Sequence, residues 1–489
     1  MLNVADLIRS LAQWPSTPGL ISAARSTRIM NAVVDSRQAT SGSLFVALRG
    51  GHQDGHDFIP AAIANGAVAV IAERPPAAGT CTTLDMERLE THVDGLSIPV
   101  CLVVPNSVAA LQKAAGYWRQ QNSVRVIGIT GSVGKTTSKE FISSVLSQRY
   151  RTLKSEGNYN NEIGLPLTLL CLTPAHQRVV LEMGMYDLGE IAQLAEIARP
   201  QIGVVTNVGP SHLERLGTIE RIAQAKAELP QSLPSANEGG IAILNIDDER
   251  VRAMAGQTQA RVFTYGLSPN ADLWADDIES KGLEGTRFRF HYRQETVHAR
   301  VPMLGRHSVH TALSAAAVGL VEGLSWSDIA TGLSDQSVQL RLAATPGPFG
   351  STILDDTYNA SPTSCIAALN LLGELSGRKI AVLGDMYELG NYEQEGHNLV
   401  GRRARDVVDL LVCVGRLGRI IGQQALEAGM PASAVSMVET NAEAIDTLQQ
   451  LVEPCDMLLI KGSRSMRMEE IVAALTRSGS GAKVLAKEQ

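Results

Sequence analysis

The run GITGSVGKTT at 128–137 places glycines, a lysine and two threonines between an apolar strand and a helix. Glycines let backbone N–H groups turn onto phosphate oxygens, and the helix N-terminus adds the positive end of its dipole. Lys135 would bridge the β- and γ-phosphates, and the Thr136 hydroxyl would bind Mg²⁺. Ile129 stands where the common phosphate loop has glycine, so a plain glycine turn is the alternative. The predicted phosphate contacts of ATP are Gly131, Ser132, Gly134, Lys135, Thr136 and Thr137.

Three further side chains follow the predicted strands of this segment. Glu182 closes the apolar run RVVLEMG, where an acid is costly unless it is paired or binds a metal; the alternative is a solvated strand-end glutamate. The loop that carries His212, in NVGPSHLERLG, would lie at the same sheet edge. Because Mg²⁺ prefers oxygen ligands, His212 taken by itself is better interpreted as a helix-capping or loop residue. Lys226 lies on a predicted helix, in RIAQAKAEL, and sequence alone favours a surface lysine.

The elements around these residues predict an α/β protein of three domains. Residues 1–105 form a small α/β unit with short apolar runs bounded by glycine. Residues 106–335 alternate strands and helices around the phosphate loop, which indicates a parallel sheet, with an antiparallel hairpin at about 285–301 and a small-residue helix at 310–324. Residues 336–489 repeat the alternation and predict a Rossmann-like, doubly wound sheet with ligand loops at its carboxyl edge.

The bulk composition excludes several classes of protein. The 489 residues are 44% hydrophobic and 19% charged, which is typical of globular domains. A net charge of −7 argues against nucleic-acid binding, and no apolar run approaches a membrane span. Six scattered cysteines without a CxxC pair favour a reducing compartment. We therefore expect a cytoplasmic protein without a membrane or nucleic-acid partner. A monomer is our working expectation, which the composition does not test.

Several motifs together resemble the Mur ligases of peptidoglycan synthesis. GITGSVGKTT, GNYNNEIGLPLTLL at 157–170, LEMG, NVGPSHLERLG, AKAEL and LGRH at 304–307 occur in the order seen in that family. The likeness covers essentially the whole chain and accounts for the unusual spacing of the phosphate loop. It implies an ATP- and Mg²⁺-dependent ligase that activates a carboxylate as an acyl phosphate and joins it to an amine.

The resemblance also implies roles for individual residues. Lys135 and Thr136 match phosphate and Mg²⁺ contacts, and Glu182 and His212 match ligands of a second Mg²⁺. Lys226 matches a lysine that CO₂ carbamylates, which turns a cation into a carboxylate-like metal ligand. The remaining matches are Asn158 beside the phosphates, Arg341 as a phosphate-contacting arginine, Asp356 at the nucleotide ribose, and Ser36 and Arg37 in the uridine-site motif.

Three motifs of the last domain resemble the member that adds D-alanyl-D-alanine to a UDP-N-acetylmuramoyl-tripeptide. They are LDDTYNASP at 354–362, LGDMYELG at 383–390 and IKGSRSMRMEE at 460–470. Tyr358, Asn359, Lys461 and Arg464 would offer polar and cationic partners to the dipeptide. A family member that adds another residue or extends folate, and a nucleotide-gated binding protein or kinase, are the alternatives.

The predicted adenine site departs from the family pattern. The family has histidine-asparagine followed by a second asparagine three residues on, whereas this chain has His307, Ser308 and then Thr311. Both amides are missing, and a hydroxyl cannot offer a base the paired donor and acceptor of an amide. We therefore expect weaker selection for adenine at this position.

Overall fold

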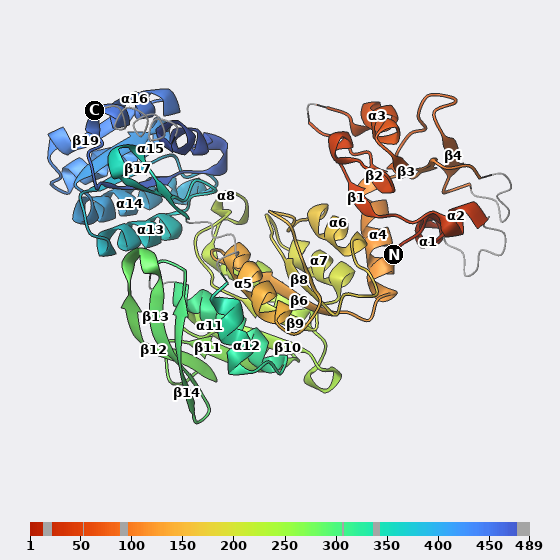
Figure 1. The fold of residues 1–489 in the computed structure, drawn as a ribbon, viewed down its shortest axis with the longest axis horizontal. Coiled ribbons are helices and arrows are strands. Elements are labelled where there is room, and N and C mark those ends of the chain that lie inside the picture. The colour runs from red at the N-terminus through yellow and green to blue at the C-terminus, as the bar shows by residue number, and fades with distance from the viewer. Residues whose placement is uncertain (13–21, 52, 89–95, 306–307, 336–342, 477–489) are drawn as a thin grey trace, which may run out of the picture.

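The structure is a computed structural model that describes residues 1–12, 22–51, 53–88, 96–305, 308–335 and 343–476. Three sheets succeed one another along the chain, each with its own helices (Figure 1). The predicted three-domain α/β class is confirmed. The domain boundaries at 1–105, 106–335 and 336–489 stay a prediction. The sequence predicts His307 and Arg341 as site residues, and both lie outside the described residues.

The N-terminal sheet has five parallel strands in the order β1-β2-β3-β5-β4. Its inner strands are short apolar runs that are buried on both faces, as parallel sheets require. The strands are β1 (Asn31–Val33), β2 (Ser43–Val46), β3 (Ala67–Ala72), β4 (Thr82–Asp85) and β5 (Val100–Val103), and the helices are α1 (Val4–Leu11), α2 (Ser22–Ser26) and α3 (Ile59–Ala64).

The central sheet has nine strands in the order β14-β13-β12-β11-β10-β9-β6-β8-β7. They are β6 (Arg125–Thr130), β7 (Thr152–Lys154), β8 (Arg178–Glu182), β9 (Ile202–Val205), β10 (Ile241–Asn245), β11 (Arg261–Gly266), β12 (Leu273–Ser280), β13 (Thr286–Tyr292) and β14 (Glu295–Val301). The predicted hairpin is confirmed by the antiparallel pair β13–β14, and β12 extends it.

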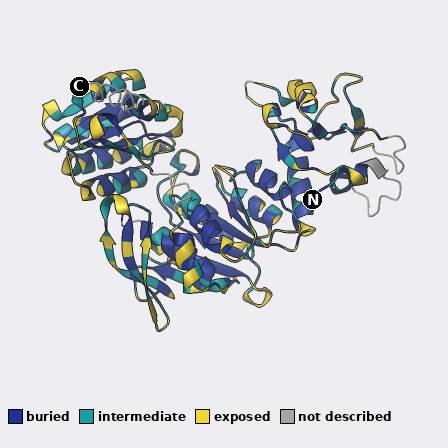
Figure 2. Ribbon diagram, in the orientation of Figure 1, coloured by how far each residue is buried: buried dark blue, intermediate teal, exposed yellow. Residues whose placement is uncertain are grey.

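Helices cover both faces of the central sheet. They are α4 (Ser107–Gln120), α5 (Lys135–Ser147), α6 (Gly164–Leu170), α7 (Glu190–Ala198), α8 (Leu213–Leu216), α9 (Ile219–Gln231), α10 (Glu249–Ala253), α11 (Ser308–Val321) and α12 (Trp326–Leu333). Alternate side chains of β6 enter two cores: Val126 packs on the side of α4 and α6, and Ile127 and Ile129 pack on the side of α5 and α11. Figure 2 shows the buried sheet between half-exposed helices.

The C-terminal sheet has the order β15-β16-β20-β17-β18-β19, with only the β15–β16 pair antiparallel. Its strands are β15 (Ala343–Pro346), β16 (Thr352–Asp355), β17 (Lys379–Leu383), β18 (Leu410–Val414), β19 (Val435–Val438) and β20 (Met457–Lys461), and its helices are α13 (Pro362–Glu374), α14 (Glu393–Val407), α15 (Gly415–Glu427) and α16 (Asn441–Leu451). Separate apolar cores on its two faces confirm the predicted doubly wound sheet.

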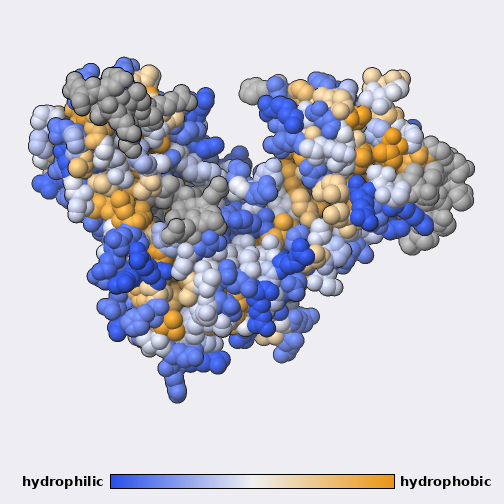
Figure 3. Space-filling model, viewed as in Figure 1, coloured by the Kyte–Doolittle hydropathy of each residue, from blue (hydrophilic) through white to orange (hydrophobic). Residues whose placement is uncertain are grey.

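The N-terminal and C-terminal lobes stand apart above the central one, and a notch separates them on the face seen in Figure 3. Within the described parts of the chain, no helix is long and apolar enough to span a membrane. All six cysteines are free thiols. The strands β9, β6 and β8 are neighbours in the central sheet, so the loops at their carboxyl ends open beside one another.

Candidate active site

The phosphate loop joins β6 to α5 and requires glycine at two points. Gly131 has φ +150° and Gly134 has φ +86°, and a Cβ built on Gly131 would lie 1.9 Å from Thr206 Oγ1. The helix α5 begins at Lys135, whose Nζ donates to Gly131 O at 2.7 Å and to Ser132 O at 3.4 Å. The strand, turn and helix context predicted for this loop is therefore present, with the ammonium folded back over the loop.

The loop after β9 braces the phosphate loop through an asparagine. Asn207 Oδ1 accepts from Val133 N at 2.9 Å, and Asn207 Nδ2 donates to Val133 O at 2.8 Å. Ser132 N donates to Asn207 O at 3.0 Å, and Ser132 Oγ donates to Gly209 O at 2.9 Å. These bonds fix the backbone of the phosphate loop before any ligand arrives, which favours tight anion binding.

Glu182 is 1% exposed at the end of β8, so the solvated-glutamate alternative is wrong. Its Oε2 accepts from Thr136 Oγ1 at 2.6 Å, and its Oε1 accepts from Asn160 Nδ2 at 2.9 Å. A buried carboxylate beside a threonine hydroxyl supplies the oxygen ligands that Mg²⁺ prefers, so these side chains fit that ion. Among the residues that the structure describes, no three His, Cys, Asp or Glu side chains already form a metal cluster.

Lys139 was missed by the sequence reasoning, although it supports this group. The side chain is fully buried, and its Nζ donates to Ser155 O at 2.7 Å and to Gly157 O at 3.3 Å. The hydroxyl of Ser155 in turn accepts from Glu182 N at 3.3 Å. The lysine thus ties the segment that carries Asn158 and Asn160 to the phosphate-loop helix. A second lysine one turn after Lys135, on the helix that follows the phosphate loop, is the signal that could have found it.

His212 precedes α8 in a left-handed conformation, with φ +55°. Its Nδ1 lies 2.7 Å from Glu388 Oε2, which comes from the loop after β17 in the C-terminal domain. The ring of Tyr186 meets the His212 ring edge-on, with 5.0 Å between centroids. The histidine is therefore more than a capping residue, because it connects two domains beside the phosphate loop.

Lys226 is 2% exposed on α9, so its interpretation as a surface lysine is wrong. The helix packs on β6 and β9, beneath the phosphate loop. Burial and the nearby positive charge of Lys135 lower the pKa of Lys226 well below its usual value. Neutral amine is thereby favoured, and in the described structure no hydrogen bond or ion pair holds this amine.

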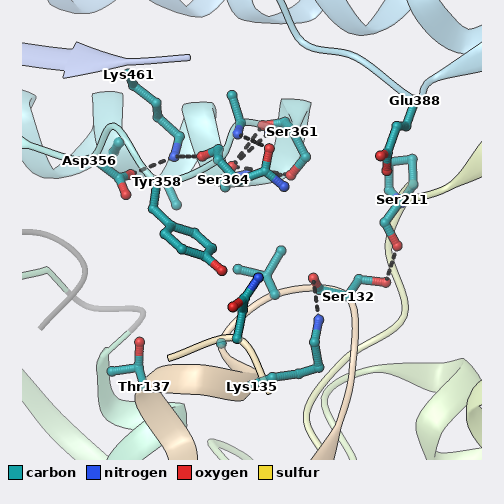
Figure 4. A pocket seen from close by; sticks show the side chains of 18 of the residues that line it. Ser132, Lys135, Thr137, Ser211, Asp356, Tyr358, Ser361, Ser364, Glu388 and Lys461 are labelled. Atoms are coloured by element: carbon teal, nitrogen blue, oxygen red, sulfur yellow. Dashed lines mark hydrogen bonds and ion pairs between the residues drawn. The ribbon is translucent and has the colours of Figure 1, made fainter. Parts of the chain in front are cut away.

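The facing wall of the site comes from the C-terminal domain and contains a buried ion pair. Lys461 is 2% exposed at the end of β20, and its Nζ donates to Asp356 Oδ2 at 2.6 Å and to Asn359 O at 2.8 Å. The side chain of Tyr358 points from this wall towards the loop that carries Lys135 (Figure 4). Arg464 lies behind it, with its Cζ 5.4 Å from the Tyr358 ring centroid.

These two walls enclose a cavity of about 330 Å³, a volume in the range of small-molecule sites. Predicted site residues from both domains line it: Ser132, Gly134, Lys135, Thr137, Asn158, Glu182, His212, Asp356, Tyr358, Asn359 and Lys461. Asn160, Tyr186, Tyr387 and Glu388 also line it and were not predicted. Gly131 and Thr136 are not part of this lining, but each is bonded to a residue that is. Gly131 O accepts from Lys135 Nζ, and Thr136 Oγ1 donates to Glu182 Oε2.

The predicted uridine-site residues lie elsewhere. Ser36 and Arg37 form a 3₁₀ turn in the N-terminal domain and do not line this cavity. Ser36 is buried, whereas Arg37 is exposed and pairs with Asp35 at 2.6 Å. Contact with Arg37 lowers the pKa of Asp35 to about 2.

The two residues at the predicted adenine site both line the cavity but differ in their bonding. The hydroxyl of Ser308 is buried and lies 3.3 Å from Thr286 Oγ1 in β13. Thr311 is partly exposed on the next turn of α11. Ser308 is therefore already engaged with the sheet, which leaves Thr311 as the more available side chain.

Comparison with known proteins gives matches along the whole chain. Residues 28–103 match the model described as "Mur ligase family, catalytic domain", residues 129–319 match "Mur ligase middle domain", and residues 341–464 match "Mur ligase, glutamate ligase domain". A UDP-N-acetylmuramoyl-tripeptide–D-alanyl-D-alanine ligase of Bacillus subtilis is 36% identical over 484 residues, which are 97% of this chain and 98% of the relative.

Solved structures give the same result. The crystal structure of MurF from Acinetobacter baumannii has a TM-score of 0.80 and 31% identity, and covers 97% of this chain and 98% of its own. The MurF ligase of Thermotoga maritima in complex with ADP has a TM-score of 0.76 and 29% identity, and covers 93% and 99%.

Proposed function

This chain belongs to the Mur ligase family, and on that premise we propose that it joins D-alanyl-D-alanine to a UDP-N-acetylmuramoyl-tripeptide in the synthesis of peptidoglycan precursors. It is an ATP-dependent amide ligase, consistent with its phosphate loop and with the ADP complex of a similar MurF ligase. The observation that carries the proposal is one cavity that the phosphate loop shares with the last domain, whose lining residues there include Tyr358–Ser361, Tyr387–Leu389 and Lys461.

The side chains in the cavity suit an acyl-phosphate route. The tripeptide carboxylate attacks the γ-phosphorus, the bond to ADP breaks, and Lys135 with the loop N–H groups offsets the negative charge on the phosphates. The amine of the dipeptide then attacks the acyl carbon, phosphate leaves, and the nitrogen loses a proton as the amide forms. An acyl phosphate hydrolyses readily, so walls from two domains that close around it serve to exclude water.

We propose that Thr136 and Glu182 hold one Mg²⁺, and that Glu182, His212 and Lys226 serve a second. The ions would supply positive charge at the transferred phosphoryl group. The support is the adjacency of the Thr136 hydroxyl and the buried Glu182 carboxylate. Removal of divalent ions by a chelator should therefore abolish ADP formation, and Mg²⁺ should restore it.

We propose further that Lys226 acts as a carbamate. A neutral amine attacks CO₂, forms an N–C bond and releases a proton, and the product is a monoanion. The lowered pKa of Lys226 provides the neutral amine, and Lys135 lies near enough to stabilise the resulting negative charge. The positive charge of Lys135, which contributes to the low pKa, therefore also favours the anionic carbamate, whereas burial favours only the neutral amine.

The remaining roles are proposals of the same kind. Residues 1–105, with Ser36 and Arg37, would bind the UDP-sugar; residues 106–335 would bind ATP; and residues 336–489 would bind the amine and part of the nucleotide. Tyr358, Asn359, Lys461 and Arg464 are assigned to the dipeptide. Asn158, His307, Arg341 and Asp356 are assigned to the nucleotide. We expect the enzyme to work as a cytoplasmic monomer.

An amine panel tests this function against its rivals. With ATP and UDP-N-acetylmuramoyl-tripeptide, D-alanyl-D-alanine should support ADP release far better than D-alanine, L-alanyl-L-alanine or diaminopimelate. A preference for diaminopimelate or L-lysine would contradict the dipeptide assignment and leave the family assignment intact. ADP release without any amine or UDP-peptide would instead favour a nucleotide-gated protein or a kinase.

A further inference from the structure

A contact between a histidine and a glutamate joins the two walls of the cavity. His212 follows β9 in the central domain, Glu388 follows β17 in the C-terminal domain, and 2.7 Å separates Nδ1 from Oε2. The distance is that of a hydrogen bond, but the ring N–H is not aligned with the oxygen.

Both residues hold an unusual backbone conformation. His212 has φ +55° and Glu388 has φ +64°, in the left-handed region that residues with a Cβ rarely adopt. Such conformations persist where the surrounding structure holds them, and they gather at functional sites. Here they occur on both sides of the same interdomain contact.

The backbones also approach closely beside this pair. Glu214 N donates to Glu388 O at 3.3 Å, and a Cβ added to Gly390 would lie 2.9 Å from Glu214 Cα. The segment after β17 is therefore seated against the first turn of α8, where only glycine fits at position 390. The side-chain contact is part of a built interface.

The His212 ring is also supported from its other side. Tyr186 meets it edge-on, and Arg215 Cζ lies 5.4 Å from the Tyr186 ring centroid. Nδ1 thus faces Glu388, whereas the described residues give Nε2 no hydrogen-bond partner. A histidine that binds a metal through one nitrogen commonly presents the other to a carboxylate, which fixes the tautomer and the ring orientation.

We propose that Glu388 is a positioning residue that orients His212 from the neighbouring domain. The His212 ring is then oriented to bind a metal ion only while the C-terminal domain contacts α8. The contact couples the domain assigned to the amine with the ions at the phosphates. The inference rests on the proposed function in one respect, the role of His212 as a Mg²⁺ ligand.

Manganese binding to the full chain in the presence of ADP tests this coupling without catalysis. Free Mn²⁺ is measured by electron paramagnetic resonance for the wild type, Glu388→Ala, Glu388→Gln and the exposed control Glu427→Gln. Loss of an outer carboxylate commonly costs about 10–100-fold in metal affinity, and we expect that loss for one ion in Glu388→Ala. Glu388→Gln should lie between, because its amide keeps an oxygen beside Nδ1 but loses the negative charge, and the control should match the wild type.

The same titration with His212→Ala, alone and combined with Glu388→Ala, separates the possible failures. We expect His212→Ala to lose the same ion and the double variant to lose no more. If His212→Ala loses the ion but both Glu388 variants bind as the wild type does, the inference is overturned and the histidine ligand stands. If His212→Ala keeps all ions, the metal role in the proposed function fails and the inference fails with it. Circular dichroism confirms that each variant is folded.

Discussion

The two walls of the cavity each contain a buried lysine, and the two lysines are placed differently. Lys139 in the central wall holds Ser155 O and Gly157 O and lies 3.2 Å from Glu140 Oε1, and neither charged side chain lines the cavity. Lys461 in the C-terminal wall holds Asn359 O and pairs with Asp356, and both charged side chains line it.

The different positions of the two lysines indicate which wall of the cavity a ligand can rearrange. The anchor of the central wall lies outside the site, so the Glu182 and Asn160 geometry is fixed independently of the substrate. The anchor of the C-terminal wall lies inside the site, so a carboxylate or ribose hydroxyl can compete for Lys461 or Asp356. We infer a rigid phosphate wall that faces an adaptable wall for the amine.

The largest effect should come from removing either anchor. Lys461→Met leaves the Asp356 carboxylate without its cation, which we expect to destabilise the protein by about 3–5 kcal/mol. Lys139→Met leaves the buried Ser155 carbonyl without its donor, whereas Glu140 keeps Lys154, so we expect a loss of about 1–3 kcal/mol. Urea unfolding followed by fluorescence measures the loss, and Lys379→Met, at a lysine that is partly exposed, is the control. A loss below about 1 kcal/mol in either variant would show that its buried lysine does not anchor the wall.

Removal of the phosphate-binding lysine should change the activation free energy of the reaction and leave the free energy of unfolding unchanged. Lys135→Ala deletes a cation beside the γ-phosphate, and we expect turnover to fall at least about 10²–10³-fold while the fold stays intact. ADP release at saturating substrates measures this. Activity within a few-fold of the wild type would contradict the phosphate-loop assignment.

Lys226 tests whether the central wall depends on a modified residue. Lys226→Ala should lose about 10²-fold or more in rate and recover in part with a small added carboxylate, which replaces the carbamate. Lys226→Arg should not recover, because a guanidinium neither takes up CO₂ nor binds a cation. A normal rate in either variant at saturating Mg²⁺ would end the carbamate proposal.

The smallest effect concerns the nucleobase. With Ser308 engaged by Thr286 and Thr311 in place of an amide, we expect GTP or ITP to support measurable turnover. Thr311→Asn should increase the preference for ATP over GTP and ITP by about 1 kcal/mol, which is several-fold in binding. Strict ATP dependence that Thr311→Asn leaves unchanged would place base recognition on other residues.

The sequence was sufficient for the features that depend on strand order. Apolar runs that end in polar loops predicted that Lys135, Glu182 and His212 share an edge, and the cavity contains all three. The doubly wound C-terminal sheet followed from the same pattern. β11 and β12 were not predicted, because their half-exposed, mixed sequences lack an apolar run.

Burial and interdomain contacts could not be read in this way. The periodicity of α9 does not tell that Lys226 is buried, because this depends on how the helix packs on β6 and β9. The pairing of His212 with Glu388 joins residues 176 positions apart, and Lys461 reaches Asp356 across 105 positions. Such contacts arise only from the tertiary arrangement.

The central claim is that the two walls together make one amide bond. The direct measurement is mass analysis of the product formed from ATP, UDP-N-acetylmuramoyl-tripeptide and D-alanyl-D-alanine. We expect one new species whose mass equals the tripeptide plus the dipeptide minus one water, with one ADP and one phosphate released for each product. An unchanged tripeptide, or ADP release without the joined product, would contradict the account.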